Sequence, residues 1–203
     1  TQEHSSAASD VYKRQASEAT IDKALGCLDI ALKQKLPCVH LVESAGVDLP
    51  NYSVKLWSKF GSVFYKNAKL SAAGIPVIAI LHGFSTAGGA YQIGMSDYVI
   101  GVKGNGMAAL AGSALLKAAT GENASNSDIG GVEMHSVVTG SVEYLVNDDA
   151  ESIITVRKLI DQLNWNENDA QKTILNFEDP DYPIDDLAGI VPTDYSKGYD
   201  VRE

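Results

Sequence analysis

The stretch VIAILHGFSTAGGAY, residues 77–91, decides the fold, because an apolar run leads straight into a glycine-rich turn. Residues 77–81 are all apolar and rich in β-branched side chains, which predicts a buried parallel strand. Residues 83–90, GFSTAGGA, predict a turn that opens a helix. Backbone N–H groups laid bare by Gly88 and Gly89 would suit a developing oxyanion, whereas such glycines are equally typical of tight packing between a helix and a strand.

A second segment of the same kind lies upstream. Residues 38–43, CVHLVE, predict another buried strand, and the loop that follows contains Ala45 and Gly46. Because the carboxyl ends of parallel strands meet at one edge of a sheet, we expect the loop at residues 44–48 to lie beside the turn at residues 86–90. Both loops would then present small residues and N–H groups to one ligand.

The remaining segments alternate between helical and extended patterns. Strands are expected at residues 98–102 and, more briefly, at 142–146. We expect helices at residues 20–34, 54–73 and 150–163, a short strand followed by a helix at 108–120, and mostly loop with one short helix at 123–138. This alternation predicts an α/β fold with a mostly parallel sheet and flanking helices.

Size and composition exclude several classes of protein. The chain has 203 residues and a formal net charge of −10, so it lacks the basic surface of a general nucleic-acid-binding protein. The sequence has no apolar run long enough to span a membrane and no Cys/His cluster for a metal ion, so we expect neither membrane nor metal binding. Cys27 and Cys38 are expected to be reduced thiols in the core.

The chain divides into three regions by composition. Residues 1–15, TQEHSSAASDVYKRQ, show no periodicity and no helix cap, and we interpret them as a sequencing or assembly artefact. Residues 16–165 contain the alternating elements and are expected to form the folded domain. Residues 166–203 are acidic and have no long apolar period, which predicts a linker.

Five segments, in order, resemble the carboxyltransferase β-subunits of biotin-dependent acyl-CoA carboxylases of the propionyl- or methylcrotonyl-CoA carboxylase type. They are SAAGIPVIAI at residues 71–80, TAGGAYQIGMSDYVIGV at 86–102, LAGSALLKAATGE at 110–122, IGGVEMHSVVTGSVEYLVNDDAESI at 129–153 and AGIVPTDYSKGYDVRE at 188–203. The resemblance implies a crotonase-like fold. It also implies that residues 16–165 are part of an N-terminal carboxyltransferase domain, and that residues 166–203 lead into a C-terminal domain that this chain lacks.

The resemblance implies the transfer of CO₂ from carboxybiotin to the α-carbon of an acyl-CoA. Gly88 and Gly89 match the N–H pair that stabilises the thioester oxyanion, and are the candidate catalytic residues. The expected substrate-binding residues are Ala45, Gly46, Ala87, Ala90, Tyr91, Gly112 and Lys117. A Gly89→Val substitution is expected to obstruct the thioester carbonyl, with less effect on folding than on activity.

Cofactor, partners and location follow from the same resemblance. Biotin is expected on a partner protein or domain, together with a biotin carboxylase, and active sites are expected between subunits of a homo-oligomer. The location would be cytoplasmic, or the mitochondrial matrix for a eukaryotic source. The chain by itself is expected to be inactive. It has Gly112-Ser113-Ala114 where the family often has Gly-Pro-Pro, which leaves the acyl group open.

Other functions fit parts of the sequence. A decarboxylase subunit of the same fold, of the glutaconyl-CoA or malonate type, would use the same N–H groups, and a fragment that only binds CoA would keep them. A serine hydrolase is a further alternative, with Ser85 as nucleophile, Asp97 or Asp128, and His135 as base. We expect His135 instead to stabilise a loop by a hydrogen bond.

Overall fold

The computed structural model describes residues 15–46, 53–163, 165, 182–190, 192–194 and 196–199. The chain separates into two compact units, Thr1–Asn166 and Glu167–Glu203. In the second unit the described residues form a 3₁₀ turn, Ile184–Asp186, and a short helix, α9, Leu187–Ile190, where the sequence predicts only a linker. The assignment of residues 16–165 and 166–203 to a carboxyltransferase domain and a linker stays a prediction.

The first unit is built on a parallel sheet. Its strands are β1 Cys38–Ser44, β2 Val77–Thr86, β3 Tyr98–Val102, β4 Met107–Ala109 and β5 Tyr144–Val146. The order is β1-β2-β3-β5, and β4 pairs with β2. Every one of these pairings is parallel, which confirms the predicted sheet.

Strand β2 runs further than the sequence predicts. Residues 83–86 were expected to be a turn, but β2 continues through Thr86. Two partners hold this extension: Ser85 pairs with Ser44 of β1, and residues 84–86 pair with β4. The first half of β2 pairs instead with β3. The glycine-rich turn is therefore shorter than predicted and begins at Ala87.

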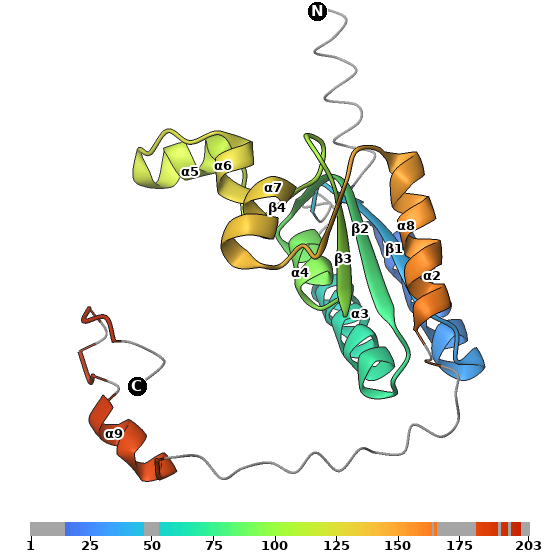
Figure 1. The fold of residues 1–203 in the computed structure, drawn as a ribbon, viewed down its shortest axis with the longest axis horizontal. Coiled ribbons are helices and arrows are strands. Elements are labelled where there is room, and N and C mark those ends of the chain that lie inside the picture. The colour runs from blue at the N-terminus through green and yellow to red at the C-terminus, as the bar shows by residue number, and fades with distance from the viewer. Residues whose placement is uncertain are drawn as a thin grey trace, which may run out of the picture. The chain divides into compact units, whose positions relative to one another are not determined.

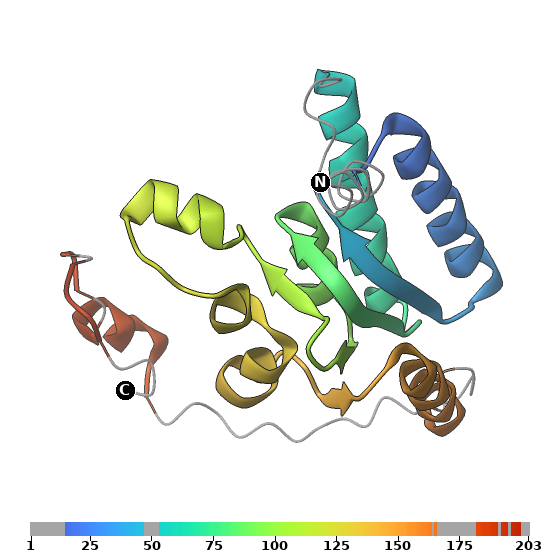
Figure 2. The same ribbon diagram turned by 90° about the horizontal axis from the view of Figure 1, so that it is seen from above.

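Helices cover both faces of the sheet (Figures 1 and 2). They are α2 Glu18–Gln34, α3 Val54–Ala72, α4 Gly88–Gly94, α5 Ser113–Thr120, α6 Asn126–Gly130, α7 Val132–Met134, a π-helix His135–Thr139 and α8 Asp149–Gln162. Ile78 and Ile80 of β2 point to the face covered by α8, whereas Ala79 and Leu81 point to the face that carries α4. Helices α2 and α3 pack together over a third apolar cluster. These residues are buried, so β2 is the centre of the core.

The long helices begin where the sequence provides caps. Ser53 accepts a hydrogen bond from the Leu56 N–H at the start of α3, and Asp148 accepts one from the Glu151 N–H at the start of α8. The helices predicted at residues 20–34, 54–73 and 150–163 are confirmed within two residues at each end. Residues 123–138 are more helical than predicted, because three short helical turns follow the capping box of Ser125 and Asp128.

The two cysteines differ in how far they are buried. Both cysteines are free thiols. Cys38 is half-buried, and burial raises the pKa of its thiol to about 11. Cys27 is exposed, so its predicted place in the core was wrong. None of the described helices is both long enough and apolar enough to cross a membrane.

Candidate functional site

A pocket of about 820 Å³ lies where the carboxyl ends of β1, β2 and β4 meet α3 and α4. It is lined by Gln15, Ala45, Gly46, Trp57, Phe60, Gly61, Phe64, Thr86, Ala87, Gly88, Tyr91, Met95, Leu110, Ala111, Gly112 and Leu115. Both predicted loops therefore reach one place at one edge of the sheet, as expected for residues 44–46 and 86–90. Val47 and Asp48 of the first loop lie outside the described residues.

The turn between β2 and α4 has an unusual backbone. Ala87 adopts φ 50° and ψ −116°, a region that L-residues rarely occupy and that costs about 1–3 kcal/mol. The Ala87 N–H donates to the Ala109 carbonyl over 3.0 Å, so β4 holds the turn in this shape. The N–H groups of Gly88 and Gly89 that follow have no acceptor among the described residues. The turn thus provides two adjacent N–H donors that no described residue accepts from.

The two glycines differ in position. Gly88 lines the pocket, and a Cβ there would lie 2.5 Å from Cε1 of Phe60. Gly89 is buried behind the lining, and a Cβ there would lie 2.7 Å from Cβ of Ser44 and still closer to Oγ of Ser85. A side chain at position 89 would therefore collide with β1 and β2 rather than obstruct the pocket. The expectation that Gly89→Val affects folding less than activity stays a prediction, but the close packing around this glycine adds a cost to folding that the sequence does not show.

The first loop offers fewer free donors than expected. The Gly46 N–H donates to Oγ of Ser44 over 3.2 Å, and its carbonyl accepts from the Ala16 N–H over 2.8 Å. Gly46 has φ +87°, a conformation that suits glycine. Ala45 and Gly46 line the pocket as predicted, but Gly46 cannot present its N–H to a ligand in this conformation.

The other predicted binding residues divide between three cavities. Ala87, Tyr91 and Gly112 line the main pocket. Ala90 lines an adjoining hollow of about 560 Å³ that shares Ala87 and Tyr91 with it. Lys117 lies apart, in a polar cavity of about 400 Å³ between α5 and α6. The structure therefore does not bring Lys117 to the oxyanion turn.

Four aromatic residues line the pocket, and we call them the aromatic wall. They are Trp57, Phe60 and Phe64 of α3 and Tyr91 of α4. The rings of Trp57 and Phe60 meet edge to face at 6.3 Å, those of Phe60 and Phe64 at 5.0 Å, and Phe64 and Tyr91 are 5.7 Å apart. Of these four residues, only Tyr91 is predicted from the sequence to belong to the site. The helical spacing of the other three was a signal, but it is equally typical of core residues.

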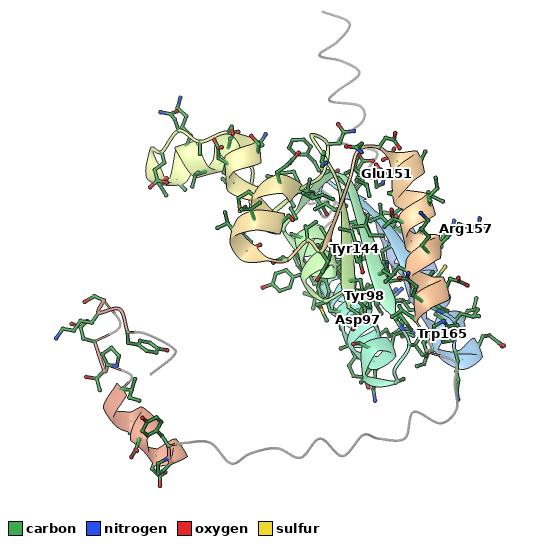
Figure 3. All side chains as sticks on the ribbon, in the orientation of Figure 1. Asp97, Tyr98, Tyr144, Glu151, Arg157 and Trp165 are labelled. Atoms are coloured by element: carbon green, nitrogen blue, oxygen red, sulfur yellow. The ribbon has the colours of Figure 1, made fainter. Side chains whose placement is uncertain are left out.

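The residues of the alternative hydrolase do not form a triad. Asp97 precedes β3, beside Tyr98 (Figure 3), whereas Ser85 lies near the carboxyl end of the parallel strand β2. Asp97 accepts hydrogen bonds from Ser71 and from the Val77 N–H. Ser85 is fully buried, and its Oγ has no partner among the described residues. A nucleophile at this position is closed off from a substrate.

His135 has the structural role that the sequence predicts. Its Nε2 lies 2.7 Å from the Ala108 carbonyl, and its Nδ1 lies 3.0 Å from Oγ1 of Thr139. Both ring nitrogens are therefore occupied, and they join the π-helix to β4. Within the described part of the chain, no group of three or more His, Cys, Asp or Glu side chains could hold a metal ion.

Residues 5–203 match the sequence profile of the carboxyl transferase domain. The chain belongs to the carboxyl transferase family. The chain is 39% identical over 186 residues to the methylcrotonoyl-CoA carboxylase β chain of Dictyostelium discoideum, covering 91% of the chain and 32% of that protein. The chain thus spans about a third of the length of this relative. The predicted family resemblance is confirmed.

Solved structures of relatives agree with the fold of this chain. The geranyl-CoA carboxylase β subunit of P. aeruginosa superposes with a TM-score of 0.68 at 41% identity, over 93% of this chain and 35% of that one. The transcarboxylase 12S subunit with methylmalonyl-CoA bound gives a TM-score of 0.70 at 29% identity, over 93% and 35%. The crotonase-like fold is therefore confirmed.

Proposed function

We propose that this chain forms the acyl-CoA side of a carboxyltransferase active site, in which CO₂ moves from carboxybiotin to the α-carbon of an acyl-CoA. The observation that supports the proposal is the turn at Ala87. It leaves the N–H groups of Gly88, which lines the pocket, and of Gly89, directly behind it, without acceptors among the described residues. The solved 12S relative, whose fold this chain shares, holds methylmalonyl-CoA.

The turn suits the chemistry of the α-carbon. Loss of a proton from that carbon places negative charge on the thioester oxygen. N–H donors held in position for that oxygen stabilise the charge without reorganising, and one such donor contributes about 10²- to 10³-fold in rate. No charged side chain is among the described residues that line the pocket, so the donors act in weakly polar surroundings. Gly88 and Gly89 are therefore proposed as the oxyanion donors.

The remaining roles are assigned by position. Ala45, Gly46, Ala87, Tyr91 and Gly112 would surround the thioester and the acyl group. Ala90, in the adjoining hollow, and Lys117, in its separate polar cavity, would contact more distant parts of the CoA. Carboxybiotin, held by a partner protein or domain, supplies the CO₂. The described lining offers no second N–H turn for it, which fits a biotin site contributed by another domain.

Partners and location follow those of the relatives. A biotin carboxylase and a biotin carrier are proposed as partners, and the 12S relative is described as a hexamer, which supports a homo-oligomer with shared sites. Several relatives are named as mitochondrial, so the mitochondrial matrix is proposed for a eukaryotic source and the cytoplasm for a bacterial one.

Binding and transfer can be tested separately. Isothermal titration of the 203-residue chain with an acyl-CoA should show saturable binding that is tighter than binding of free pantetheine. Addition of free carboxybiotin should give no carboxylated product, because the chain spans about a third of the length of its relatives. The proposal fails if no CoA ester binds. Carboxyl transfer by the purified chain alone would refute the proposed need for a second domain.

A further inference from the structure

A further cavity, of about 320 Å³, lies at the amino ends of the strands, opposite the main pocket. Its lining includes Pro76, which precedes β2, and Asp97 and Tyr98 at the start of β3. Leu163 and Trp165, just beyond α8, line another side of it. Figure 3 shows Asp97, Tyr98 and Trp165 at this end of the sheet. No described residue lines both this cavity and the main pocket, so the two are separate.

The carboxylate of Asp97 is held in place by hydrogen bonds. Its Oδ1 accepts from the Ser71 hydroxyl, and its Oδ2 accepts from the Val77 N–H over 2.8 Å. The Asp97 N–H donates in turn to the Val77 carbonyl over 2.7 Å. Since a carboxylate oxygen can accept two hydrogen bonds, each oxygen of Asp97 has one acceptor position left.

This carboxylate has no counter-charge within the described part of the chain. No described Lys, Arg or His side chain forms an ion pair with Asp97, and none of them lines the cavity. Two half-buried aromatic side chains, Tyr98 and Trp165, share the cavity with it. The face of an aromatic ring attracts a cation, most strongly where water is excluded. A carboxylate and two aromatic rings in one small cavity therefore favour an organic cation as the ligand.

The free acceptor positions favour a guanidinium over an ammonium group. A guanidinium is planar, so it can stack on an aromatic ring while its edge donates two parallel N–H groups to a carboxylate. One free position on each oxygen of Asp97 matches this two-fold donation. An ammonium group is compact and strongly hydrated, so it would lose more hydration on entering the cavity.

We propose that this cavity binds a guanidinium group, which donates to Asp97 and stacks on Trp165. The net charge of −10 on the chain favours the approach of such a cation. The inference does not depend on the proposed function, because the cavity lies away from the candidate oxyanion turn.

Tryptophan fluorescence and calorimetry test this inference with two probes of the same shape. The chain has two tryptophans, so in Trp57→Phe only Trp165 emits. Titration of this variant with Nα-acetyl-arginine amide, at about 0.15 M salt to screen nonspecific attraction, should give a saturable change in emission. Nα-acetyl-citrulline amide carries an uncharged urea in place of the guanidinium and should bind at least about tenfold more weakly. Calorimetry of the wild type should give the same ratio. Equal binding of the two probes, or no saturable response in either measurement, would overturn the inference.

Single variants locate the bound probe in calorimetry. Asp97→Asn keeps an oxygen for the Val77 N–H but removes the charge, so the affinity for the arginine probe should fall by about tenfold. Trp165→Leu should lower it by about fivefold and keeps the test valid if the Asp97 variant does not fold. Asp161→Asn is the matched control, because Asp161 is an exposed residue of α8 outside the lining and its loss changes the net charge equally. An affinity that is unchanged in both Asp97→Asn and Trp165→Leu would overturn the inference.

Two further probes identify the source of the guanidinium group. Methylguanidine represents a free guanidino compound, and an acetylated tripeptide amide with arginine in the middle represents a side chain of a partner protein. Tighter binding of the tripeptide assigns the cavity to a partner's arginine, whereas equal binding assigns it to a free compound, and both results support the site. An acyl-CoA added in excess should leave the affinity for the arginine probe unchanged. Displacement of the probe by the acyl-CoA would place it in the main pocket and overturn the inference.

Discussion

A valine at position 89 tests the packing beneath the candidate oxyanion turn. Its Cβ would lie 2.7 Å from Cβ of Ser44 and closer still to Oγ of Ser85. Ser85 is fully buried, and Cβ of Ser44 is fixed by the backbone of β1, so neither atom can withdraw cheaply. Overpacking of this kind lowers the free energy of unfolding by about 1–3 kcal/mol. Valine adds two further carbons, so we expect a loss of ~3 kcal/mol. For a chain of this size the Tm should fall by about 6–12 °C.

Thermal unfolding followed by far-UV circular dichroism measures this effect. Gly94→Val is the control, because Gly94 lies in the same helix and a Cβ there would meet no other part of the described chain within 4 Å. That variant should stay within ~0.5 kcal/mol of the wild type. Adding Ser85→Ala to Gly89→Val removes one colliding atom and should restore part of the lost stability. Equal unfolding temperatures for Gly89→Val and Gly94→Val would refute the described packing.

Three further predictions concern single side chains. Ser85→Ala removes a buried hydroxyl that has no partner among the described residues, so the free energy of unfolding should be unchanged or higher by ~1 kcal/mol. A fluorophosphonate probe should label neither the wild type nor the variant. Labelling of the wild type that disappears in the variant would support the hydrolase. His135→Ala removes the hydrogen bond to the Ala108 carbonyl, so the free energy of unfolding measured in urea should fall by ~1–2 kcal/mol. A variant as stable as the wild type would contradict the structural role of His135. The hydrogen bond from Lys59, followed by that from Lys55, holds the pKa of Glu18 below its ordinary value. The stabilisation from this ion pair is therefore present above the ordinary pKa and is lost as the pH falls through the lowered pKa. Between neutral pH and about pH 3, the wild type should therefore lose more stability than Lys59→Met, and equal losses would count against this ion pair.

The fold could be predicted wherever the signal is local. Residues 77–81 and 98–102 are apolar runs, and their strands begin and, for the second, end as predicted. The extension of β2 through Thr86 could not be predicted, because small polar residues are typical of a turn. Pairing with Ser44 of β1 and with the distant residues 107–109 holds them extended. Whether such residues form a turn or a strand depends on a pairing partner in another part of the chain.

The candidate site likewise combines features that the local sequence indicates with features that depend on distant parts of the chain. Gly88 and Gly89 carry a visible pattern, but nothing in the sequence marks Ala87 as the residue with positive φ, since alanine rarely adopts it. The helical period of α3 also does not show which face of the helix meets the core and which meets the pocket. Its buried positions include Val63 and Leu70, whereas Phe60 and Phe64 lie on a neighbouring stripe that meets the pocket. Periodicity identifies a face but not what that face contacts.

The bond between the Ala87 N–H and the Ala109 carbonyl has a consequence for biosynthesis. The ribosome releases the chain from its N-terminus, so β1, α3 and the first half of β2 can associate while Ala109 is still in the exit tunnel. Until β4 emerges, the second half of β2 has only one of its two neighbours, and nothing holds Ala87 in its costly conformation. The nascent protein should therefore pack α2 against α3 and pair β1 with the first half of β2 before its amide donors are aligned. A pause in translation before β4 would leave the apolar side of the pocket exposed to chaperones.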